Sequence, residues 1–372
     1  MQNFLPGVQL SIVVPTFNEK SNIAELLRRI GDCMDQVRWE AIFVDDNSPD
    51  GTAQVVRELA LQDARVRLVH RIGRRGLSTA CVEGMLASSA PYVAVMDADL
   101  QHDETLLPAM LRELQTGQLD IVVGSRYVDQ GSVGEWDAER AKISRIATRL
   151  ASTVVKADLR DPMSGFFMLR REVLYEAMPN LSGIGFKILL DLFASVPRPM
   201  RFLELGYTFK SRFSGESKLD SMVAWEYLML LLDKSIGRYV PVRFIPFAMI
   251  GGLGVLVHML ILLALFKGME VDFANGQIAA SVVTMAFNFL LNNAFTYRDR
   301  RLTGWGLVKG WISFSIACSF GAAANVGIAT YLFRENTTNW ALAALAGIVV
   351  GAVWNYAVTA VYTWNKPKNV AA

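Results

Sequence analysis

Two carboxylates close together in the sequence are the residues of this chain that most clearly suggest chemistry. Asp97 and Asp99 flank Ala98 at the end of an apolar run, residues 92–97. Carboxylates this close repel each other unless a cation lies between them, and Mg²⁺ in proteins takes one or two carboxylates together with substrate phosphates. Capping of a helix that begins near His102 is the alternative role. The spacing therefore indicates a site for a divalent cation and a phosphorylated substrate, with helix capping left open.

Polar residues also follow two other apolar runs. Residues 10–15 lead into the polar segment 16–19, and residues 41–46 end in Asp45-Asp46. Short β-branched runs alternate with helical patterns, which predicts a mostly parallel sheet covered on both faces. Ligands bind beyond the carboxyl ends of the strands of such a sheet, so these acidic residues are expected at one edge. The predicted strands are 10–15, 41–46, 66–70, 92–97 and 120–123, and the predicted helices include 19–36, 53–62, 77–89 and 104–116.

Several common classes of α/β protein find no support in the sequence. No G-x-G-x-x-G follows a predicted strand, as a nicotinamide-binding domain requires, and no G-x-x-x-x-G-K-[ST] marks a P-loop. No Ser/His/Asp arrangement is visible, and His102 is expected at the surface. Cys33, Cys81 and Cys318 lie far apart without metal-type spacing, which favours reduced residues that serve packing.

The charge distribution divides the chain in two. Of the 72 charged residues, 60 lie in the first 243 positions, and the overall net charge of +2 gives no indication of nucleic-acid binding. Four long uncharged stretches follow, each longer than the ~20 residues that a helix needs to cross a bilayer core. One such stretch would suit a buried helix of a soluble protein, but four in succession predict four transmembrane helices. The stretches are 244–266, 273–297, 310–333 and 336–365.

Basic residues near these stretches indicate their orientation. Nine lie on one side and two on the other, so the positive-inside rule predicts a cytoplasmic N-terminal domain and a cytoplasmic C-terminus. The nine are Lys234, Arg238, Arg243, Arg298, Arg300, Arg301, Lys309, Lys366 and Lys368, and the two are Lys267 and Arg334.

The apolar half also shows an internal repeat with an offset of 67 residues. Gly254 matches Gly321 and Asn288 matches Asn355, and the strings FNFLLNNAFTY and WNYAVTAVYTW share their aromatic, Asn and Thr positions. The offset predicts two helical hairpins that form one four-helix unit with parallel repeats, and chance matching is the alternative. The two asparagines are expected to donate interhelical hydrogen bonds, with a polar lining for a lipid headgroup path as the alternative.

Seven motifs occur in order along the N-terminal half: PTFNE (15–19), VDDNSPDGT (44–52), DADLQH (97–102), GSRY (124–127), MSGFFMLRREV (163–173), GIGFKILLDL (183–192) and SRFSGESKL (211–219). This set resembles family 2 glycosyltransferases of the GT-A fold, and the last two strings resemble dolichol-phosphate mannose synthases in particular. The resemblance covers roughly residues 10–220. The apolar half is similar to GtrA-type four-helix domains, which some prokaryotic synthases of this kind carry at the C-terminus.

The resemblance implies roles for individual residues. The base and ribose region of a nucleotide would contact Pro15, Phe17, Glu19, Val44 and Asp46. A divalent cation (Mg²⁺ or Mn²⁺) and the diphosphate would contact Asp97, Ala98, Asp99 and Gln101, with Asp97, Asp99 and Gln101 as metal ligands. The phosphates would face Arg126, Arg140, Ser144, Arg212 and Lys218, and catalysis would rest on Asp99, Arg126, Arg140, Ser144 and Lys218. A solvated helix face is the alternative for Arg140, and many relatives have Tyr in place of Phe17, which puts one hydroxyl contact in doubt.

The activity that the resemblance implies is inverting transfer of mannose from GDP-mannose to the phosphate of a polyprenyl (dolichyl) lipid. A lipid phosphate is already ionised near pH 7 and needs no general base, and no base is obvious in 183–192, where Asp191 sits in an apolar run. The anionic attacker and leaving group do need charge screening, which a divalent ion with Arg126, Arg212 and Lys218 would supply. The alternatives are a polyprenyl-phosphate glucosyl- or hexosyltransferase that uses a UDP sugar, and an apolar half that acts as a lipid-linked-sugar flippase or scaffold.

The expected organisation has three parts. Residues 1–219 form a cytosolic GT-A domain with a Rossmann-like, mostly parallel sheet, and 220–243 form amphipathic interface helices. Residues 244–372 form an all-α GtrA-type domain of four transmembrane helices. The segment 221–240 suits the membrane interface because it is apolar, aromatic and basic at its end, with packing against the first domain as the alternative. We therefore expect a multi-pass protein of the cell membrane whose partners are a nucleotide sugar and a polyprenyl phosphate; the sequence leaves its oligomeric state open.

Overall fold

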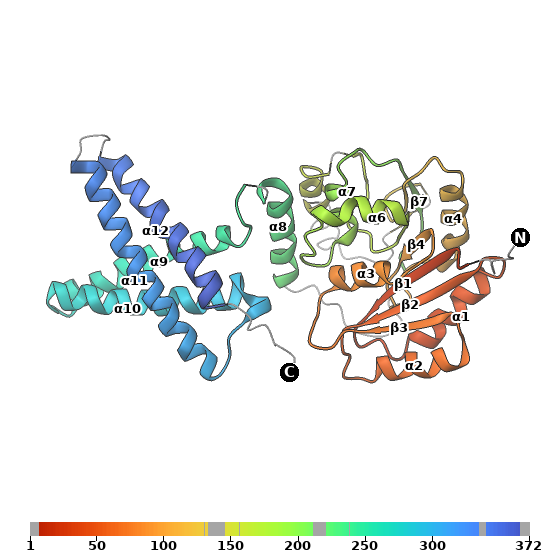
Figure 1. Ribbon diagram of the computed structural model, residues 1–372, viewed down its shortest axis with the longest axis horizontal. Helices are drawn as coiled ribbons and strands as arrows, with labels where there is room; N and C mark the ends of the chain where they lie inside the picture. The colour runs from red at the N-terminus through yellow and green to blue at the C-terminus, as the bar shows by residue number, and fades with distance from the viewer. Residues whose placement is uncertain are drawn as a thin grey trace, which may run out of the picture. The chain divides into compact units, whose positions relative to one another are not determined.

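The chain divides into two compact units, Met1–Arg238 and Tyr239–Ala372, which we call the sheet unit and the helical unit. The computed structural model describes residues 7–129, 131–132, 146–155, 157–210, 221–237, 239–334 and 340–364. Figure 1 shows a twisted sheet with helices on both faces in the sheet unit and long helices in the helical unit. Each unit is described by itself below.

The sheet has seven strands in the order β3-β2-β1-β4-β6-β5-β7. All neighbouring pairs are parallel except those of β6, which runs antiparallel to both β4 and β5. The mostly parallel sheet that the sequence predicted is therefore present. The strands are β1 (Leu10–Thr16), β2 (Trp39–Asp45), β3 (Val66–His70), β4 (Tyr92–Val95), β5 (Ile121–Ser125), β6 (Phe167–Arg170) and β7 (Phe202–Gly206).

Both faces of the central strands are buried, which explains their nearly continuous apolar runs. Along β1, Val13 packs into one core cluster while Ile12 and Val14 pack into the other. Gly84 lets its helix approach β1 closely, because a Cβ at this position would collide with Val13. One face is covered by α3 (Leu77–Leu86), α6 (Arg171–Ala177), α7 (Ile188–Ser195) and α8 (Ser221–Ile236), and the other by α1 (Ile23–Cys33), α2 (Thr52–Gln62) and α4 (Leu107–Gln115).

Helix α8 is held to the sheet unit by a buried ion pair. The Lys234 ammonium lies 2.6 Å from Asp191 of α7, and its side chain is only 7% exposed. Tyr227 adds a hydrogen bond to the Ala147 carbonyl at 2.6 Å, and Leu230 is buried beside it. Packing of this segment against the first domain, the alternative left open above, is therefore present. Lys234 is an internal partner rather than a surface charge, which corrects its place among the nine orienting residues and leaves eight against two.

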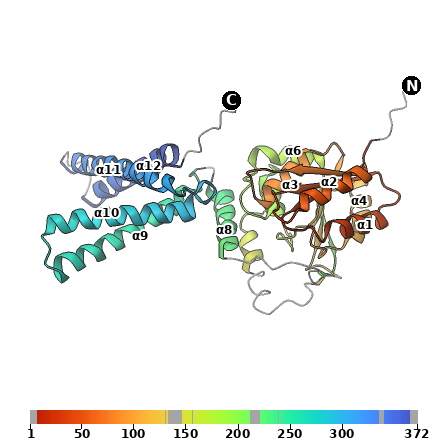
Figure 2. The same cartoon turned by 90° about the horizontal axis from the view of Figure 1, so that it is seen from below.

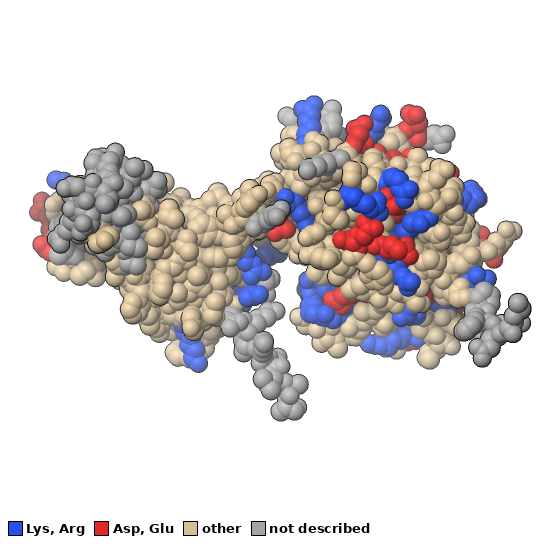
Figure 3. Space-filling model, turned by 45° about the horizontal axis from the view of Figure 1, so that its top comes forward, with Lys and Arg blue, Asp and Glu red and all other residues tan. Residues whose placement is uncertain are grey.

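The helical unit contains helices at all four predicted stretches (Figure 2). Three segments are long and apolar enough to cross a membrane, Phe244–Gly268, Asn275–Thr296 and Trp305–Ala323, and Val349–Tyr362 is a shorter apolar helix within the described residues. On the face drawn in Figure 3 the sheet unit carries many charged residues, whereas the described surface of the helical unit is mostly uncharged. Its helices are α9 (Phe244–Leu263), extended by a π-helix (Ala264–Gly268), α10 (Phe273–Leu291), extended by a π-helix (Asn292–Thr296), α11 (Trp305–Arg334) and α12 (Trp340–Tyr362).

The predicted internal repeat is visible in the structure as the same glycine–asparagine contact in both hairpins. Gly254 of α9 lies so close to Asn288 of α10 that a Cβ at Gly254 would collide with the amide, and Gly321 of α11 meets Asn355 of α12 in the same way. Within the described residues the side-chain oxygens of Asn288 and Asn355 accept no hydrogen bond, and donation by their amide groups stays a prediction. Each amide packs against a glycine, and this contact sets how closely the two helices of a hairpin approach.

Aromatic contacts between the two hairpins are reciprocal. Phe247 of the first hairpin contacts Tyr356 of the second at a centroid distance of 5.6 Å, and Phe314 contacts Phe289 at 5.8 Å. These are the same two positions of the repeat exchanged between hairpins, as across a two-fold axis. Tyr297 stacks on Trp364, its own counterpart in the repeat, at 4.1 Å and 6°. The helical unit is thus a pair of hairpins related by a pseudo-two-fold rotation.

Candidate functional site

The carboxyl ends of β2, β1 and β4 lie side by side at one edge of the sheet, as the sequence predicted. Pro15 of β1 pairs with Val44 of β2, and both are buried between the layers. The Thr16 hydroxyl donates to the buried Asp45 carboxylate at 3.3 Å, and the Ser48 hydroxyl donates to the same oxygen at 2.6 Å. Asp45 therefore orders the turn after β2 and joins it to the end of β1.

Asp46 anchors the segment that leads into α3. Its carboxylate accepts hydrogen bonds from the Arg71 guanidinium at 2.6 Å and from the Gly76 N–H at 2.8 Å. Arg71 is 1% exposed. Burial raises the pKa of Asp46 above its ordinary value, although both hydrogen bonds act in the opposite direction. Asp46 is thus a fixed acidic group at the rim of the sheet.

Phe17 and Glu19 lie on the loop after β1. The Arg75 guanidinium lies 4.5 Å from the centroid of the Phe17 ring. Glu19 accepts a hydrogen bond from the Asn22 side chain at 2.7 Å. Arg75 was missed by the sequence analysis, and no local signal distinguishes it from Arg74 beside it. It places an exposed cation against the aromatic ring that was assigned to the nucleotide.

The Asp97–Asp99 turn follows β4, and its two carboxylates differ in exposure. The Asp97 side chain is 38% exposed, whereas Asp99 is 6% exposed and accepts the Gln101 N–H at 3.2 Å. Leu100 has a φ of 62°, in the left-handed region, so the turn is sharp. Gln101 is held in turn by Lys210, since its side-chain amide donates to the Lys210 carbonyl at 2.9 Å and its backbone carbonyl accepts the Lys210 N–H at 3.1 Å.

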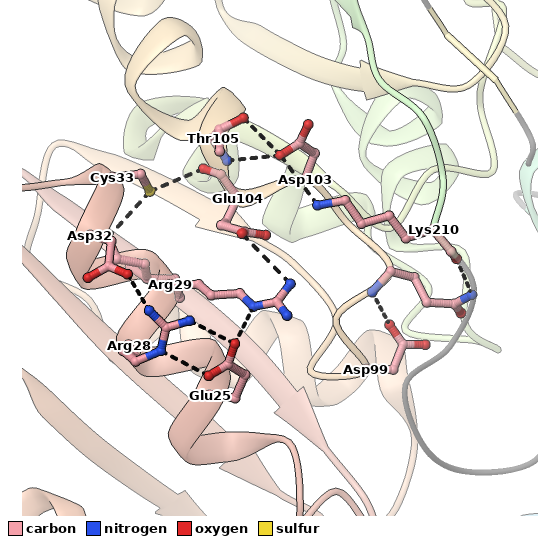
Figure 4. Close-up of polar contacts among 12 residues, drawn as sticks. Glu25, Arg28, Arg29, Asp32, Cys33, Asp99, Asp103, Glu104, Thr105 and Lys210 are labelled. Carbon is pink, nitrogen blue, oxygen red and sulfur yellow. Dashed lines mark hydrogen bonds and ion pairs between the residues drawn. The ribbon is translucent and has the colours of Figure 1, made fainter.

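Helix capping after this turn is done by a third carboxylate. Asp103 accepts hydrogen bonds from the N–H and the hydroxyl of Thr105, at the start of the 3₁₀ turn Glu104–Leu106. Figure 4 shows this group beside Glu104 and Arg29 of α1, with Asp99 on the other side of Lys210. Because Asp103 caps this turn, helix capping does not explain the acidic pair Asp97 and Asp99.

His102 is buried beneath the turn, which corrects the expectation of a surface residue. It is 3% exposed and stacks on Phe166 at a centroid distance of 5.2 Å, with edge contacts to Tyr207 and Phe209. The Asp97 N–H donates to its Nδ1 at 3.1 Å, and Nε2 lies 3.7 Å from an Asp97 carboxylate oxygen. Burial lowers the pKa of His102 to about 4, so the ring is neutral near pH 7. A neutral ring that accepts at Nδ1 carries its proton on Nε2, toward Asp97.

Arg126 of the GSRY string is paired with a buried carboxylate. Its Nε and Nη2 donate to Asp161 at 2.8 and 2.7 Å, and Asp161 is fully buried. Burial opposes the charge, but the hydrogen bonds and attraction from Asp161 win and raise the pKa of Arg126. Phe209 lies 5.5 Å from the guanidinium. Two donors of the fork are thereby fixed toward Asp161, which orients the guanidinium rigidly.

Lys187 adds a cation to which no local pattern in the GIGFKILLDL string gives a role. Its ammonium donates to the Met163 carbonyl at 3.2 Å. Burial, and next the charge of Arg126, lower its pKa to about 8, while Asp161 and Asp97 act in the opposite direction. Met163 lies two residues before Gly165, which is beside the Asp97 carboxylate, so Lys187 lies close to the acidic turn.

The acidic turn fits a divalent cation that binds together with phosphates. Within the described residues no three His, Cys, Asp or Glu side chains converge, so a site made by protein ligands alone is absent there. Mg²⁺ bound with one or two carboxylates and substrate oxygens needs no such cluster. Gly165 leaves space beside Asp97, because a Cβ there would lie 3.0 Å from its Oδ2. Asp97, Asp99 and Gln101 supply oxygen ligands of the type that hard cations prefer.

Four of the predicted site residues lie outside the described part of the chain: Arg140, Ser144, Arg212 and Lys218. Their assignments remain predictions. The other predicted residues, from Pro15 to Arg126, all lie at or directly after the carboxyl ends of β1, β2, β4 and β5. This edge combines a fixed acidic turn, a rim of aromatic and acidic groups, and two partly buried cations. Such a combination suits an anionic substrate that arrives with a cation.

Known protein families match both units. Residues 11–177 match glycosyl transferase family 2, and residues 246–364 match the GtrA/DPMS transmembrane domain. The first match lies within the sheet unit and the second within the helical unit.

Curated relatives match over most of their length. The chain is 32% identical to a dolichol-phosphate mannosyltransferase of Pyrococcus furiosus over 96% of this chain and 99% of that protein. It is 35% identical to a dolichol-phosphate mannosyltransferase of Saccharomyces cerevisiae over 63% of this chain and 89% of that protein. Among solved structures, glucosyl-3-phosphoglycerate synthase of Mycobacterium tuberculosis matches with a TM-score of 0.43 and 20% identity over 61% of this chain and 80% of that chain. This last similarity is too weak to support an inference about substrates.

Proposed function

The chain belongs to glycosyl transferase family 2 and is a membrane glycosyltransferase with a GtrA/DPMS transmembrane domain, and we propose that it transfers mannose from GDP-mannose to a polyprenyl phosphate. The observation that carries the proposal is the similarity to a dolichol-phosphate mannosyltransferase across both units. The mannose and lipid-phosphate parts of the proposal rest on that relative, and the donor nucleotide is inferred from the same source.

The residues of the Asp97–Asp99 turn would hold a divalent cation with the donor diphosphate. Asp97 and Asp99 would supply carboxylate oxygens and Gln101 an amide oxygen, while the Lys210 backbone keeps Gln101 in place. A bound cation would neutralise charge on the leaving diphosphate. His102 would keep the turn in its shape through the Asp97 N–H. The nucleotide would lie toward Phe17, Glu19 and Asp46 at the ends of β1 and β2.

The acceptor needs no carboxylate base, because a lipid phosphate is already an anion near pH 7. The carboxylate that the GIGFKILLDL string offers is used elsewhere, since Asp191 is fully buried and paired with Lys234 at 2.6 Å. Its oxygens also accept hydrogen bonds from the N–H and hydroxyl of Ser182. Attack by a phosphate oxygen on the anomeric carbon, with departure of the nucleoside diphosphate from the opposite face, would invert the configuration.

Two cations would manage the repulsion between the attacking and leaving groups. Arg126 is held by Asp161, so its guanidinium would be preorganised rather than ordered by the substrate. Lys187, whose pKa is lowered to about 8 by burial and then by Arg126, would supply a second positive charge below that pH. Arg140, Ser144, Arg212 and Lys218 remain the proposed further contacts to the phosphates.

The sheet unit would face the cytosol. With Lys234 excluded, the remaining basic residues near the predicted spans still favour the same side by eight to two. The polyprenyl phosphate would present its only polar group at the membrane surface, and α8 carries exposed apolar residues, Leu228 and Ile236, that suit an interface.

The test is an assay of the full chain reconstituted in vesicles with a polyprenyl phosphate and one nucleotide sugar at a time. GDP-mannose with Mg²⁺ or Mn²⁺ is expected to give a polyprenyl phosphate hexose by mass spectrometry, and a chelator should abolish it. Turnover of UDP-glucose in place of GDP-mannose would replace the proposed donor. A product formed on a free sugar rather than on the lipid phosphate would overturn the proposed acceptor.

A further inference from the structure

The helical unit contains a cavity of about 220 Å³ between α9 and α10. This volume lies below the ~300 Å³ at which sites for drug-sized ligands begin, and at about 30 Å³ per water it equals about seven waters. A group the size of one sugar ring therefore suits it. Gly251, Gly254, Val255 and His258 of α9 line the cavity together with Thr284 and Asn288 of α10.

Two oxygen atoms in this wall lack hydrogen-bond partners. The Thr284 hydroxyl oxygen and the Asn288 amide oxygen are both buried, and neither has a partner within the described residues. A buried polar group without a partner costs about 1–3 kcal/mol. Both oxygens belong to residues that line the cavity, so a donor bound there would reach them once the hydroxyl and the amide turn toward it. His258 completes the polar wall and lies 3.4 Å from the Gln277 amide oxygen.

The cavity lies within two segments that are apolar enough to span a membrane, Phe244–Gly268 and Asn275–Thr296. At about 1.5 Å per residue, His258 lies roughly 21 Å along the helix from Phe244. Polar and ionisable residues at such depth are rare and usually functional. Val255 in the lining is 62% exposed, so a lipid has access to the cavity from the hydrocarbon side.

The internal repeat distinguishes the residues that line the cavity from those that pack the two helices of each hairpin together. The glycine–asparagine contact occurs in both hairpins, at Gly254 with Asn288 and at Gly321 with Asn355. The other polar lining positions are not repeated, because the second hairpin has Asn325 where the first has His258 and Gly351 where the first has Thr284. The lining is therefore particular to the first hairpin, whereas the contact that closes each hairpin is common to both.

We propose that this cavity binds the sugar ring of a membrane glycolipid. Sugar hydroxyls donate hydrogen bonds, which the Thr284 and Asn288 oxygens need, and they also accept them from the asparagine amide and the threonine hydroxyl. No Lys or Arg is among the described residues that line the cavity, which disfavours a phosphate or diphosphate as the bound group. The inference uses the residues of α9 and α10 alone and does not depend on the sugar or the acceptor of the transfer reaction.

The test uses the full chain in lipid nanodiscs and an octyl β-mannoside that carries a photoreactive diazirine on its alkyl chain. Adducts mapped by mass spectrometry are expected in Phe244–Gly268 and Asn275–Thr296. Excess octyl β-mannoside should suppress these adducts, whereas octyl phosphate at the same concentration should not. Equal suppression by both competitors, or adducts spread evenly over the lipid-facing helices, would overturn the proposal.

A matched pair of glycine variants controls for folding. A Cβ at Gly251 or at Gly252 would meet no atom within 4 Å, so both helix positions tolerate a larger side chain. Gly251→Leu should fill the cavity and reduce specific labelling at least tenfold, whereas Gly252→Leu, outside the lining, should label as the wild type does. Thr284→Val keeps the shape and removes the hydroxyl, and it should lower labelling severalfold. Unchanged labelling of both Gly251→Leu and Thr284→Val contradicts the site.

Discussion

The two units of this chain bury polar groups in different ways. In the sheet unit, two fully buried carboxylates are paired with cations, Asp161 with Arg126 and Asp191 with Lys234. In the helical unit, the buried polar groups are amides and hydroxyls, and the amide oxygens of Asn288 and Asn355 have no partner among the described residues. The Asp161–Arg126 and Asp191–Lys234 pairs each occur once in the chain, whereas the glycine–asparagine contact occurs in both hairpins.

Single ion pairs and a repeated contact support a site in different ways. Single ion pairs hold groups that must meet a charged substrate in one geometry, so the loss of one partner leaves an uncompensated charge. A repeated contact fixes the framework and leaves the remaining positions of each copy able to diverge. The following variants test that distinction, from the largest expected effect to the smallest.

Loss of the buried cation of α8 should have the largest effect on stability. Lys234→Met leaves Asp191 charged and buried, and we expect the free energy of unfolding of the sheet unit to fall by about 3–5 kcal/mol. The matched control is Lys210→Met, because that ammonium is 44% exposed and lies 3.9 Å from Asp103. Its effect should stay within about 1 kcal/mol. Thermal unfolding in detergent measures both, and equal losses would remove the contrast between buried and exposed pairs.

The acidic turn should dominate activity. Asp99→Ala removes a proposed cation ligand, and we expect kcat to fall by roughly 10²–10³-fold, as for the loss of one strong electrostatic contact in a transition state. Asp103→Ala, which removes the nearby cap, should lose about 1 kcal/mol of stability and keep most activity. Rates measured with Mg²⁺, Mn²⁺ and a chelator compare the two variants. Near-normal turnover of Asp99→Ala would refute the proposed cation site.

The buried His102 should make the sheet unit sensitive to acid. Its pKa is about 4 in the folded protein because of burial, below the ordinary value of 6.5, so the unfolded chain binds the proton more tightly. Stability from this group is complete above pH 6.5 and is lost as the pH falls toward 4, by about 3 kcal/mol in total. His102→Phe keeps a ring in the aromatic stack and should remove this part of the pH dependence. Identical slopes between pH 7 and 4.5 for variant and wild type would show that another group is responsible.

The repeated contact should respond equally in both hairpins. Gly254→Ala and Gly321→Ala each force a methyl group into an asparagine amide, and each should destabilise the helical unit by about 1–3 kcal/mol. Gly252→Ala, which meets open space, should change stability by less than about 0.5 kcal/mol. A large effect at one of the two contact glycines alone would break the equivalence of the hairpins.

The part of the fold that local patterns determine was predictable. The five strands predicted from β-branched runs and the helices between them are present, because the apolar pattern of each element is a local property of the sequence. Strands β6 and β7 were missed. β6 has four residues and lies antiparallel between β4 and β5, so its position follows from long-range pairing that hydrophobic period does not encode.

The site was predictable only as far as its strand ends. Asp97 and Asp99 stand out in the sequence because carboxylates this close repel each other unless a cation lies between them. The burial of His102 depends on Phe166, Tyr207 and Phe209, which lie far along the chain. The pairing of Arg126 with Asp161 is likewise long-range. A single sequence offers no local signal for such contacts.

The stacked pair at the pseudo-two-fold axis bears on how the helical unit is assembled. A residue that stacks on its own counterpart is the mark of a self-association between identical pieces, and here Tyr297 and Trp364 occupy that position in a single chain. Covalent linkage converts such an association into an intramolecular one with a high effective concentration. The two hairpins therefore stay associated however dilute the protein becomes in its bilayer. The sequence of each hairpin can diverge without loss of the association.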